Sequence, residues 1–354
     1  MLYQTENQHG GDVYGGGITL DFSANTNPLG TPPGVLEAVC RALPRLHRYP
    51  DPYCRRLVQA IAGHEQVPAS YILCGNGAAD LIYTYCAALR PRTAVELAPT
   101  FVEYGAGLAQ VGCRVERYFL HQAQNFDLDE RFLSFLEEKK PEVVFLCNPN
   151  NPTGRLIPLP LLEQILQYCA AQGARLFLDE CFLDLTEDGV SAKSLLAAHP
   201  ELLILKAFTK SYGMAGIRLG YCLCADNALL HRMAATSPPW NVSSPAQSAG
   251  VAALAERDFL QRTLSLVRTE RRWLTDNLTA LGFWVCPSHA NYLLFRGPLG
   301  LREGLLQQGI AIRGCGNYNG LGDGWYRIAV RPHGENEALI TAIRQFCKEK
   351  SLWQ

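Results

Sequence analysis

Short apolar runs and amphipathic stretches alternate along the first two thirds of the chain. Apolar residues at helical spacing predict helices over residues 35–43, 53–64, 78–89 and 159–171. Short apolar or β-branched runs predict strands over residues 71–73, 93–97, 114–119, 142–146, 174–178, 202–208 and 217–224. Strands that alternate with helices are typical of a mostly parallel sheet with helices on both faces. The pattern therefore predicts an α/β fold whose ligands lie at the carboxyl ends of the strands.

The pattern changes after residue 241. A single long helix is predicted over residues 244–281, followed by strands over 292–295, 310–313 and 325–330 and helices over 299–308 and 335–348. This arrangement predicts a second, smaller α+β domain. We place the boundary near residue 245, with a large domain over 31–245 and a small domain over 246–354.

Charge and cysteine content narrow the class of protein. The formal net charge of −1 provides no basic surplus for nucleic acid or an anionic membrane. No apolar run could cross a bilayer, and residues 1–17 lack the apolar core of a signal peptide. The 13 cysteines contain no Cys-x-x-Cys pair, and no two histidines have His-x-x-x-His spacing. We therefore expect a cytoplasmic enzyme with free thiols, no metal site, and neither nucleic acid nor membrane as a partner.

A lysine follows the predicted strand 202–208 in a loop of small residues, with an arginine eight residues later. Lys210 in such a place would be desolvated, which lowers the pKa of an amine and makes it a nucleophile for Schiff-base chemistry. Arg218 can bind a phosphate group through its guanidinium. The alternative for Lys210 is a surface lysine in a turn.

Three other strand ends carry polar residues. Asp179 follows a buried apolar strand and could pair with a protonated ring nitrogen, although a helix N-cap is the ordinary alternative. Asn151 lies in a Pro-rich turn that could present its amide to a phenolate oxygen, or could serve only as a turn. The turn Gly75-Asn76-Gly77 leads into a predicted helix whose first N–H groups can bind an anion.

Taken together, these motifs resemble the fold-type-I pyridoxal 5′-phosphate (PLP) enzymes of the aspartate aminotransferase superfamily, over essentially the whole chain. The resemblance rests on the motif Asn148-Pro149-Asn150-Asn151-Pro152-Thr153-Gly154 and on the eight-residue spacing between Lys210 and Arg218. The resemblance implies that Lys210 holds PLP as a Schiff base, Asp179 pairs with the pyridine nitrogen and Asn151 binds the ring oxygen. It also implies ring stacking by Phe101 and phosphate binding by Arg218 and by Gly77, Ala78 and Ala79.

The same resemblance implies a homodimer with shared active sites, because Tyr49 matches a tyrosine that reaches the neighbouring subunit's cofactor phosphate. Two positions depart from the common pattern. Ala207 stands where a phosphate-binding serine is frequent, so Thr209 is the candidate to compensate. Phe182 stands where histidinol-phosphate aminotransferases usually carry tyrosine, which removes one hydrogen bond to the ring oxygen.

Within the superfamily, the chain most resembles the threonine-phosphate decarboxylases of cobalamin biosynthesis. His9-Gly10-Gly11, the segment Ser23-Ala24-Asn25-Thr26-Asn27-Pro28 and two C-terminal segments, 312–318 and 326–331, carry this resemblance. It implies an N-terminal arm over residues 1–30 that packs at the active site, with His9 and Asn25 binding the substrate phosphate. Arg313 and Arg327 are the candidates to bind the substrate carboxylate, with a structural salt bridge as the alternative for each.

The expected reaction is decarboxylation of L-threonine O-3-phosphate to (R)-1-amino-2-propanol O-2-phosphate and CO₂. Three alternatives stay open. The first is an aminotransferase acting on histidinol phosphate or a related compound. The second is a decarboxylase that prefers L-serine O-phosphate, which lacks one methyl group and is hard to discriminate by a hydrophobic pocket. The third is a catalytically silent PLP-binding regulator, which the lack of a basic DNA-binding segment disfavours.

Overall fold

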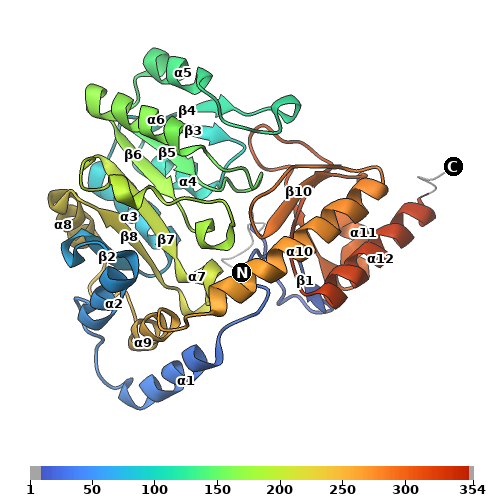
Figure 1. Ribbon diagram of the computed structural model, residues 1–354, viewed down its shortest axis with the longest axis horizontal. Coiled ribbons are helices and arrows are strands. Elements are labelled where there is room, and N and C mark those ends of the chain that lie inside the picture. Colours follow the sequence, from blue (N-terminus) through green and yellow to red (C-terminus); the bar gives the residue numbers. More distant parts are fainter. Residues whose placement is uncertain (1–8, 351–354) are drawn as a thin grey trace.

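A seven-stranded sheet forms the centre of the larger half of the molecule in the computed structural model, which describes residues 9–350 (Figure 1). In spatial order its strands are β2 (Ile72–Gly75), β8 (Gly220–Cys224), β7 (Leu202–Ala207), β6 (Arg175–Asp179), β5 (Val143–Cys147), β3 (Thr93–Ala98) and β4 (Arg114–Phe119). Only β8 runs antiparallel to its neighbours. The prediction of a mostly parallel sheet in an α/β fold is confirmed.

Both faces of this sheet are buried, which explains why the sequences of its central strands are continuous apolar runs. In β5, Val144 and Leu146 belong to one hydrophobic core, whereas Val143, Phe145 and Cys147 belong to another. Successive side chains of a strand point to opposite faces, so two layers of helices must cover the sheet. Polar side chains can then reach a ligand only from the ends of the strands, which the two layers of helices do not cover.

The helices of the larger half fall into two groups. The face that Val144 contacts is covered by α1 (Pro33–Ala42), α2 (Arg55–Glu65), α5 (Arg131–Lys139), α6 (Leu159–Gln172) and α9 (Ser244–Ala253). The other face is covered by α3 (Ala78–Leu89), α4 (Glu103–Gln110) and α8 (Asn227–Thr236). A single helical turn, α7 (Phe208–Ser211), follows β7 directly.

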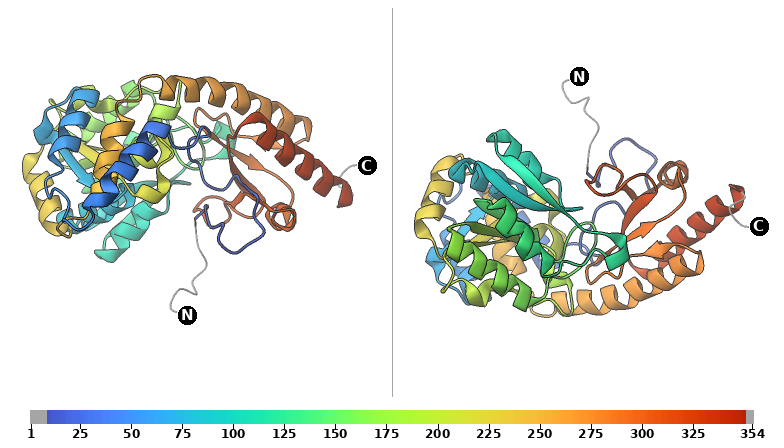
Figure 2. Two further views of the ribbon diagram at one scale, coloured as in Figure 1. Left: turned by 90° about the horizontal axis from the view of Figure 1, so that it is seen from below. Right: turned by 90° about the horizontal axis from the view of Figure 1, so that it is seen from above.

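The smaller half is built on a four-stranded antiparallel sheet with its own core. Its order is β12 (Arg313–Gly314), β13 (Trp325–Ala329), β10 (Tyr292–Arg296) and β9 (Trp284–Val285). Helices α10 (Phe259–Ala280), α11 (Leu301–Gln307) and α12 (His333–Glu349) pack with it, and α10 runs along the side of both halves (Figure 2). The predicted smaller α+β unit is thereby observed.

The N-terminal segment joins the two halves. Its strand β1 (Leu20–Asp21) pairs in parallel with β11 (Ile310–Ala311) of the smaller half. Further on, the amide of Asn27 donates to the backbone oxygen of Ser211 and to the hydroxyl of Thr263. Residues 1–8 of the predicted arm lie outside the described residues, and the predicted domain boundaries at residues 30 and 245 stay predictions.

Two expected elements differ in the structure. The single helix predicted over residues 244–281 is two helices, because α9 packs on α1 and α2 of the larger half while α10 continues to the smaller half. The chain turns between them at residues 254–258, yet each helix keeps an apolar face, so the sequence periodicity does not reveal the break. The strand predicted over residues 310–313 is divided at Ile312, since β11 pairs with β1 and β12 pairs with β13.

Within residues 9–350, no helix is both long enough and apolar enough to cross a membrane.

Candidate active site

A cavity of about 220 Å³ lies where the carboxyl ends of the large sheet meet the smaller half and the N-terminal segment. Twelve of the residues predicted to bind the cofactor or the substrate line it: His9, Asn25, Ala78, Ala79, Phe101, Asn151, Asp179, Thr209, Lys210, Arg218, Arg313 and Arg327. Two others do not, namely Gly77, which abuts Arg218, and Tyr49.

Lys210 supplies an amine to this cavity. It lies in the single helical turn α7 at the end of β7, and its Nζ is 5.4 Å from the centre of the Phe182 ring. Burial lowers the pKa of Lys210 to about 8, and the positive charges of Arg327 and Arg218 act in the same direction. An amine with this pKa is partly neutral near physiological pH and is therefore a usable nucleophile.

Asp179 ends β6 and is 5% exposed. The hydroxyl of Tyr104 donates to its Oδ2 at 2.6 Å, and the backbone N–H of Cys181 donates to its Oδ1 at 2.9 Å. Burial raises the pKa of this carboxyl above its ordinary value, although both hydrogen bonds oppose the rise. No cationic side chain of the described residues forms a salt bridge with Asp179 within 4 Å, so a protonated ring nitrogen would supply the missing counter-charge.

Asn151 is oriented by a residue from the other half of the molecule. Its Oδ1 accepts a hydrogen bond from Nη1 of Arg327 at 2.5 Å, which leaves its amide NH₂ available as a donor. The preceding Asn150 is itself fixed, because its side chain donates to the backbone oxygen of Pro99 and to the hydroxyl of Thr153. The turn thus presents a hydrogen-bond donor of the kind that a phenolate oxygen requires.

The first turn of α3 forms a cradle for an anion. Gly77 has a φ of +85°, and a Cβ at this position would lie 2.7 Å from Nη2 of Arg218. The positive φ favours glycine here, and a side chain would displace the guanidinium from this backbone. The N-terminal N–H groups of α3 and the charge of Arg218 together suit a phosphate group. Thr209, which is buried, lines the same cavity beside Ala207.

The N-terminal segment contributes His9 and Asn25. His9 Nε2 lies 2.7 Å from Oε1 of Glu103, whose other oxygen accepts from the hydroxyl of Tyr83 at 2.6 Å. Asn25 is 1% exposed, and neither atom of its amide group has a hydrogen-bond partner among the described residues. A buried amide without partners is costly, and a polar ligand in the cavity would remove that cost.

Two arginines come from neighbouring strands of the smaller half. Arg313 in β12 and Arg327 in β13 face each other in the strand register. Nη2 of Arg327 donates to the backbone oxygen of Ser23, whereas its Nε has no partner among the described residues. Nη2 of Arg313 donates to Oδ1 of Asn317, and its guanidinium lies 5.5 Å from the centre of the Tyr318 ring. No carboxylate of the described residues forms a salt bridge with Arg327, which leaves its charge for an anionic ligand.

Several residues of the cavity were missed by sequence reasoning. Tyr104 holds Asp179, and Tyr318, Ser23, Cys147 and Cys181 line the cavity. Cys147 and Cys181 could have been found, because each directly adjoins a strand end that was already singled out. Ser23 and Tyr318 lie in the segments 23–28 and 312–318 that carried the family resemblance, but no role was predicted for them. Tyr104 carried no signal, since its role depends on a contact with a distant part of the chain.

Tyr49 lies outside the cavity. Its ring stacks on Trp240 with the ring centres 4.5 Å apart, and its side chain is 78% exposed. Among residues 9–350, Tyr49 is not one of those that line the cavity. Its expected role toward a neighbouring subunit therefore stays a prediction.

The donor set fits PLP. The lysine amine suits the aldehyde, the buried carboxylate suits the pyridinium nitrogen, and the α3 cradle with Arg218 suits the phosphate. Phe101, which packs edge-on against Tyr104 at 5.6 Å, offers a ring for stacking. Phe182 packs edge-on against Tyr292 and supplies no hydroxyl to the site.

Comparison with known proteins gives the same classification. Residues 18–346 match the family model described as aminotransferase class I and II. The chain is 41% identical to threonine-phosphate decarboxylase of Salmonella typhimurium over 92% of this chain and 90% of that protein. Among solved structures, histidinol-phosphate aminotransferase from Clostridium acetobutylicum has a TM-score of 0.87 and 28% identity, over 93% of this chain and 99% of that chain. L-threonine-O-3-phosphate decarboxylase from Porphyromonas gingivalis has a TM-score of 0.83 and 25% identity over the same shares.

Proposed function

We propose, from the premise that this chain belongs to the class I and II aminotransferase family, that it decarboxylates L-threonine O-3-phosphate with PLP as its cofactor. The product would be (R)-1-amino-2-propanol O-2-phosphate, a precursor for cobalamin biosynthesis. The observation that carries this proposal is the 41% identity to a threonine-phosphate decarboxylase over most of both chains. The polar residues of the cavity agree with a substrate that carries both a phosphate and a carboxylate.

PLP, when bound, supplies an electron sink for the electron pair that remains on the amino acid when CO₂ leaves. In the proposed assignment Lys210 holds the cofactor covalently, and Asp179 keeps a proton on its ring nitrogen. Asn151 donates to the ring oxygen. Arg218 and the first turn of α3 (Gly77, Ala78 and Ala79) bind the cofactor phosphate, with Thr209 as an additional donor.

The opposite wall of the cavity binds the substrate in this proposal. His9 and Asn25 contact its phosphate, and Arg313 and Arg327 hold its carboxylate. Carbon dioxide is neutral and cannot form the ion pair that the carboxylate forms. Interactions that bind the carboxylate much more tightly than the departing CO₂ would therefore slow the reaction. Arg327 already shares its guanidinium with Asn151 and Ser23, which limits how closely it can bind the carboxylate. Lys210 or a water molecule then delivers a proton to Cα.

A CO₂-release assay tests the function. The holoenzyme should release CO₂ from L-threonine O-3-phosphate without any 2-oxo acid, and L-serine O-phosphate and histidinol phosphate serve as the competing substrates. Faster turnover of serine phosphate would change the substrate assignment but keep the reaction. Conversion of the cofactor to its pyridoxamine form, with no CO₂ release, would establish the histidinol-phosphate-type aminotransferase instead. The similarity of the fold to one such enzyme makes this the second candidate.

We also propose a cytoplasmic homodimer with shared active sites. Trp240, which stacks on Tyr49, is exposed, as are Leu43, Leu46 and Tyr53 close to Tyr49 in the chain, and burial of these apolar side chains would favour association. A complementation assay tests the sharing. Lys210→Ala and Tyr49→Ala chains, each impaired alone, should regain up to about a quarter of wild-type activity when mixed and allowed to exchange subunits. A monomer in sedimentation analysis, or no recovery on mixing, would count against shared sites.

A further inference from the structure

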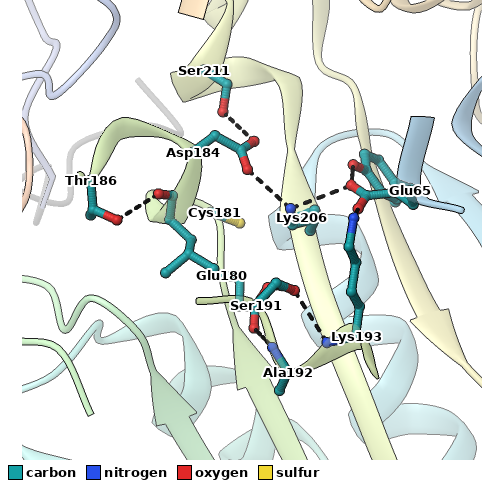
Figure 3. Close-up of polar contacts among 12 residues, drawn as sticks. Glu65, Glu180, Cys181, Asp184, Thr186, Ser191, Ala192, Lys193, Lys206 and Ser211 are labelled. Atoms are coloured by element: carbon teal, nitrogen blue, oxygen red, sulfur yellow. Dashed lines mark hydrogen bonds and ion pairs between the residues drawn. The ribbon is translucent and has the colours of Figure 1, made fainter. Parts of the chain in front are cut away.

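A cluster of buried charges lies behind the strand ends that carry Lys210 and Asp179. We call it the Lys206 cluster, and its members are Glu65, Glu180, Asp184, Ser191, Lys193, Lys206, Ser211 and Tyr221. Figure 3 shows the contacts that join Glu65 in α2 and Lys206 in β7 to the segment after β6 and to Ser211, the last residue of α7. None of its members lines the active-site cavity, so the cluster has no place in the chemistry described above.

Lys206 is the centre of the cluster. It lies in β7 and is 5% exposed, with its Nζ 3.0 Å from Oδ1 of Asp184 and 3.3 Å from Oε1 of Glu65. Burial by itself lowers the pKa of Lys206, but the charges of Asp184 and Glu65 outweigh it and raise this pKa. These two carboxylates therefore favour the charged form of Lys206.

Glu65 is ionised for the complementary reason. Burial by itself raises its pKa, but the charge of Lys206 and hydrogen bonds from Tyr221 and Lys193 lower it to about 2. The pair therefore stays charged at neutral pH in an environment with little water. Buried ion pairs of this kind are often no more stabilising than apolar residues of equal size, so stability alone is a weak reason for the cluster.

The cluster reaches Lys210 through one residue. Oδ2 of Asp184 accepts a hydrogen bond from the hydroxyl of Ser211 at 3.0 Å, and Ser211 directly follows Lys210 in the chain. The helical turn α7 has only four residues, so its own backbone bonds restrain it weakly. Asp184, held by Lys206, thus limits the position of the turn from which the Lys210 side chain extends.

The cluster also reaches Asp179. The next residue, Glu180, accepts hydrogen bonds from the hydroxyl of Ser191 at 2.6 Å and from the backbone N–H of Ala192 at 2.8 Å. Asp184 lies five residues after Asp179 in the segment that follows β6. The charge of Lys206 also acts on Glu180, so the cluster is linked electrostatically to the strand end that carries Asp179 and by hydrogen bonds to the turn that carries Lys210.

We propose that Lys206 and Asp184, acting through Ser211, are positioning residues that set where the Nζ of Lys210 lies relative to Asp179. Neither residue touches the cofactor or the substrate. The proposal rests on Lys210 as the cofactor lysine, which belongs to the proposed function, but it does not depend on which substrate is decarboxylated.

Ser211→Ala and Asp184→Asn test this role, with Lys193→Met as the matched control. Lys193 bonds the same Glu65 but has no contact with Asp184 or Ser211 among the interactions described. Two quantities are measured on the apoenzyme: the dissociation constant of PLP from protein fluorescence, and the pH midpoint of Lys210 labelling by trinitrobenzenesulfonate, located by peptide mass mapping. Neither measurement requires a substrate.

We expect Ser211→Ala and Asp184→Asn each to weaken PLP binding about ten-fold, the size of one lost hydrogen bond to a charged group. The labelling midpoint of Lys210 should rise, because a displaced amine is less desolvated. Lys193→Met should change PLP binding by no more than about two-fold. Melting curves establish that the variants fold. If Asp184→Asn does not fold, Ser211→Ala, which loses a single hydroxyl, still tests the positioning role.

The proposal is overturned if folded Ser211→Ala binds PLP and labels Lys210 as the wild type does. It is equally overturned if Lys193→Met has the same effects as Ser211→Ala, since the cluster would then act only through general stability. A wild-type chain that binds no PLP gives a different result, because it refutes the cofactor assignment on which the proposed function depends.

Discussion

The two walls of the active-site cavity differ in how far their polar groups are already paired. On the wall formed by the large sheet, both oxygens of Asp179 accept hydrogen bonds, and a buried charge cluster lies behind Lys210. On the wall formed by the N-terminal segment and the smaller half, the Asn25 amide and Nε of Arg327 have no partner among the described residues.

This difference indicates two kinds of ligand. A wall whose groups are held by other protein atoms suits a resident cofactor, because preorganised groups need no rearrangement when it binds. A wall with unpaired buried groups gains the most free energy when a ligand arrives, so it suits a substrate that comes and goes. Substitutions on the first wall should affect every reaction of the enzyme, whereas those on the second should affect mainly substrate binding.

The largest effect is expected from Lys210→Ala. This change removes the covalent attachment of PLP, so decarboxylation should fall by a factor of about 10³ or more. The absorbance band of the protein-bound cofactor should be lost as well, which spectroscopy on the purified chain can establish. A variant that keeps both the band and the activity would refute the role of Lys210.

Arg327→Leu should affect substrate turnover much more than cofactor binding, because Arg327 lies on the second wall. Loss of its charge should lower kcat/KM for L-threonine O-3-phosphate about 100-fold, as is typical when a buried charged partner is removed. PLP binding should change much less than in Lys210→Ala. Arg331→Leu is the control, because Arg331 pairs with Glu335 outside the cavity. Equal losses in both arginine variants would argue against a carboxylate-binding role.

Tyr104→Phe is expected to weaken PLP binding about ten-fold, because Asp179 loses one of its two hydrogen-bond donors. The pKa of Asp179 should rise further, which makes the carboxylate a poorer counter-charge for the ring nitrogen. Tyr168→Phe is a suitable control, since the Tyr168 hydroxyl bonds the backbone of Leu136 far from the cavity. A fluorescence titration with PLP measures both variants.

Asn25→Ala should lower kcat/KM for threonine phosphate by a factor of about ten and leave PLP binding unchanged. The melting temperature of the apoenzyme should stay the same or rise, because the variant no longer buries an unpaired amide. A loss of stability with no change in kcat/KM would mean that Asn25 is a structural residue.

The smallest effect is expected on the pH at which Lys210 is labelled, because Arg327 on the second wall affects the pKa of Lys210 on the first wall. Lys210 in the apoenzyme should be labelled half-maximally near pH 8, whereas an unperturbed lysine has a pKa of 10.5. The charge of Arg327 contributes to this lowering, so Arg327→Leu should move the midpoint upward. An unchanged midpoint would show that Arg327 does not contribute to the lowered pKa of Lys210, which burial and Arg218 would then explain.

Much of the fold could be predicted from the hydrophobic pattern. Helix α3 (Ala78–Leu89) and strand β4 (Arg114–Phe119) have the bounds that the sequence predicted. The turn between α9 and α10 could not be predicted, because the apolar faces of the two helices follow one another without an interruption in spacing. The division of residues 310–313 between two sheets was likewise hidden, since it depends on pairing with β1.

By itself, the sequence determined which chemical groups adjoin the strands: an amine at Lys210, a carboxylate at Asp179 and an amide at Asn151 at or after the ends of parallel strands, and a guanidinium at Arg218 just before β8. These groups follow local motifs, and parallel strand ends meet at one edge of a sheet. Only the tertiary structure decided their partners, such as Tyr104 on Asp179 and Arg327 on Asn151. Those pairs join residues that lie far apart in the chain, and their distances depend on how the two halves and the N-terminal segment pack together.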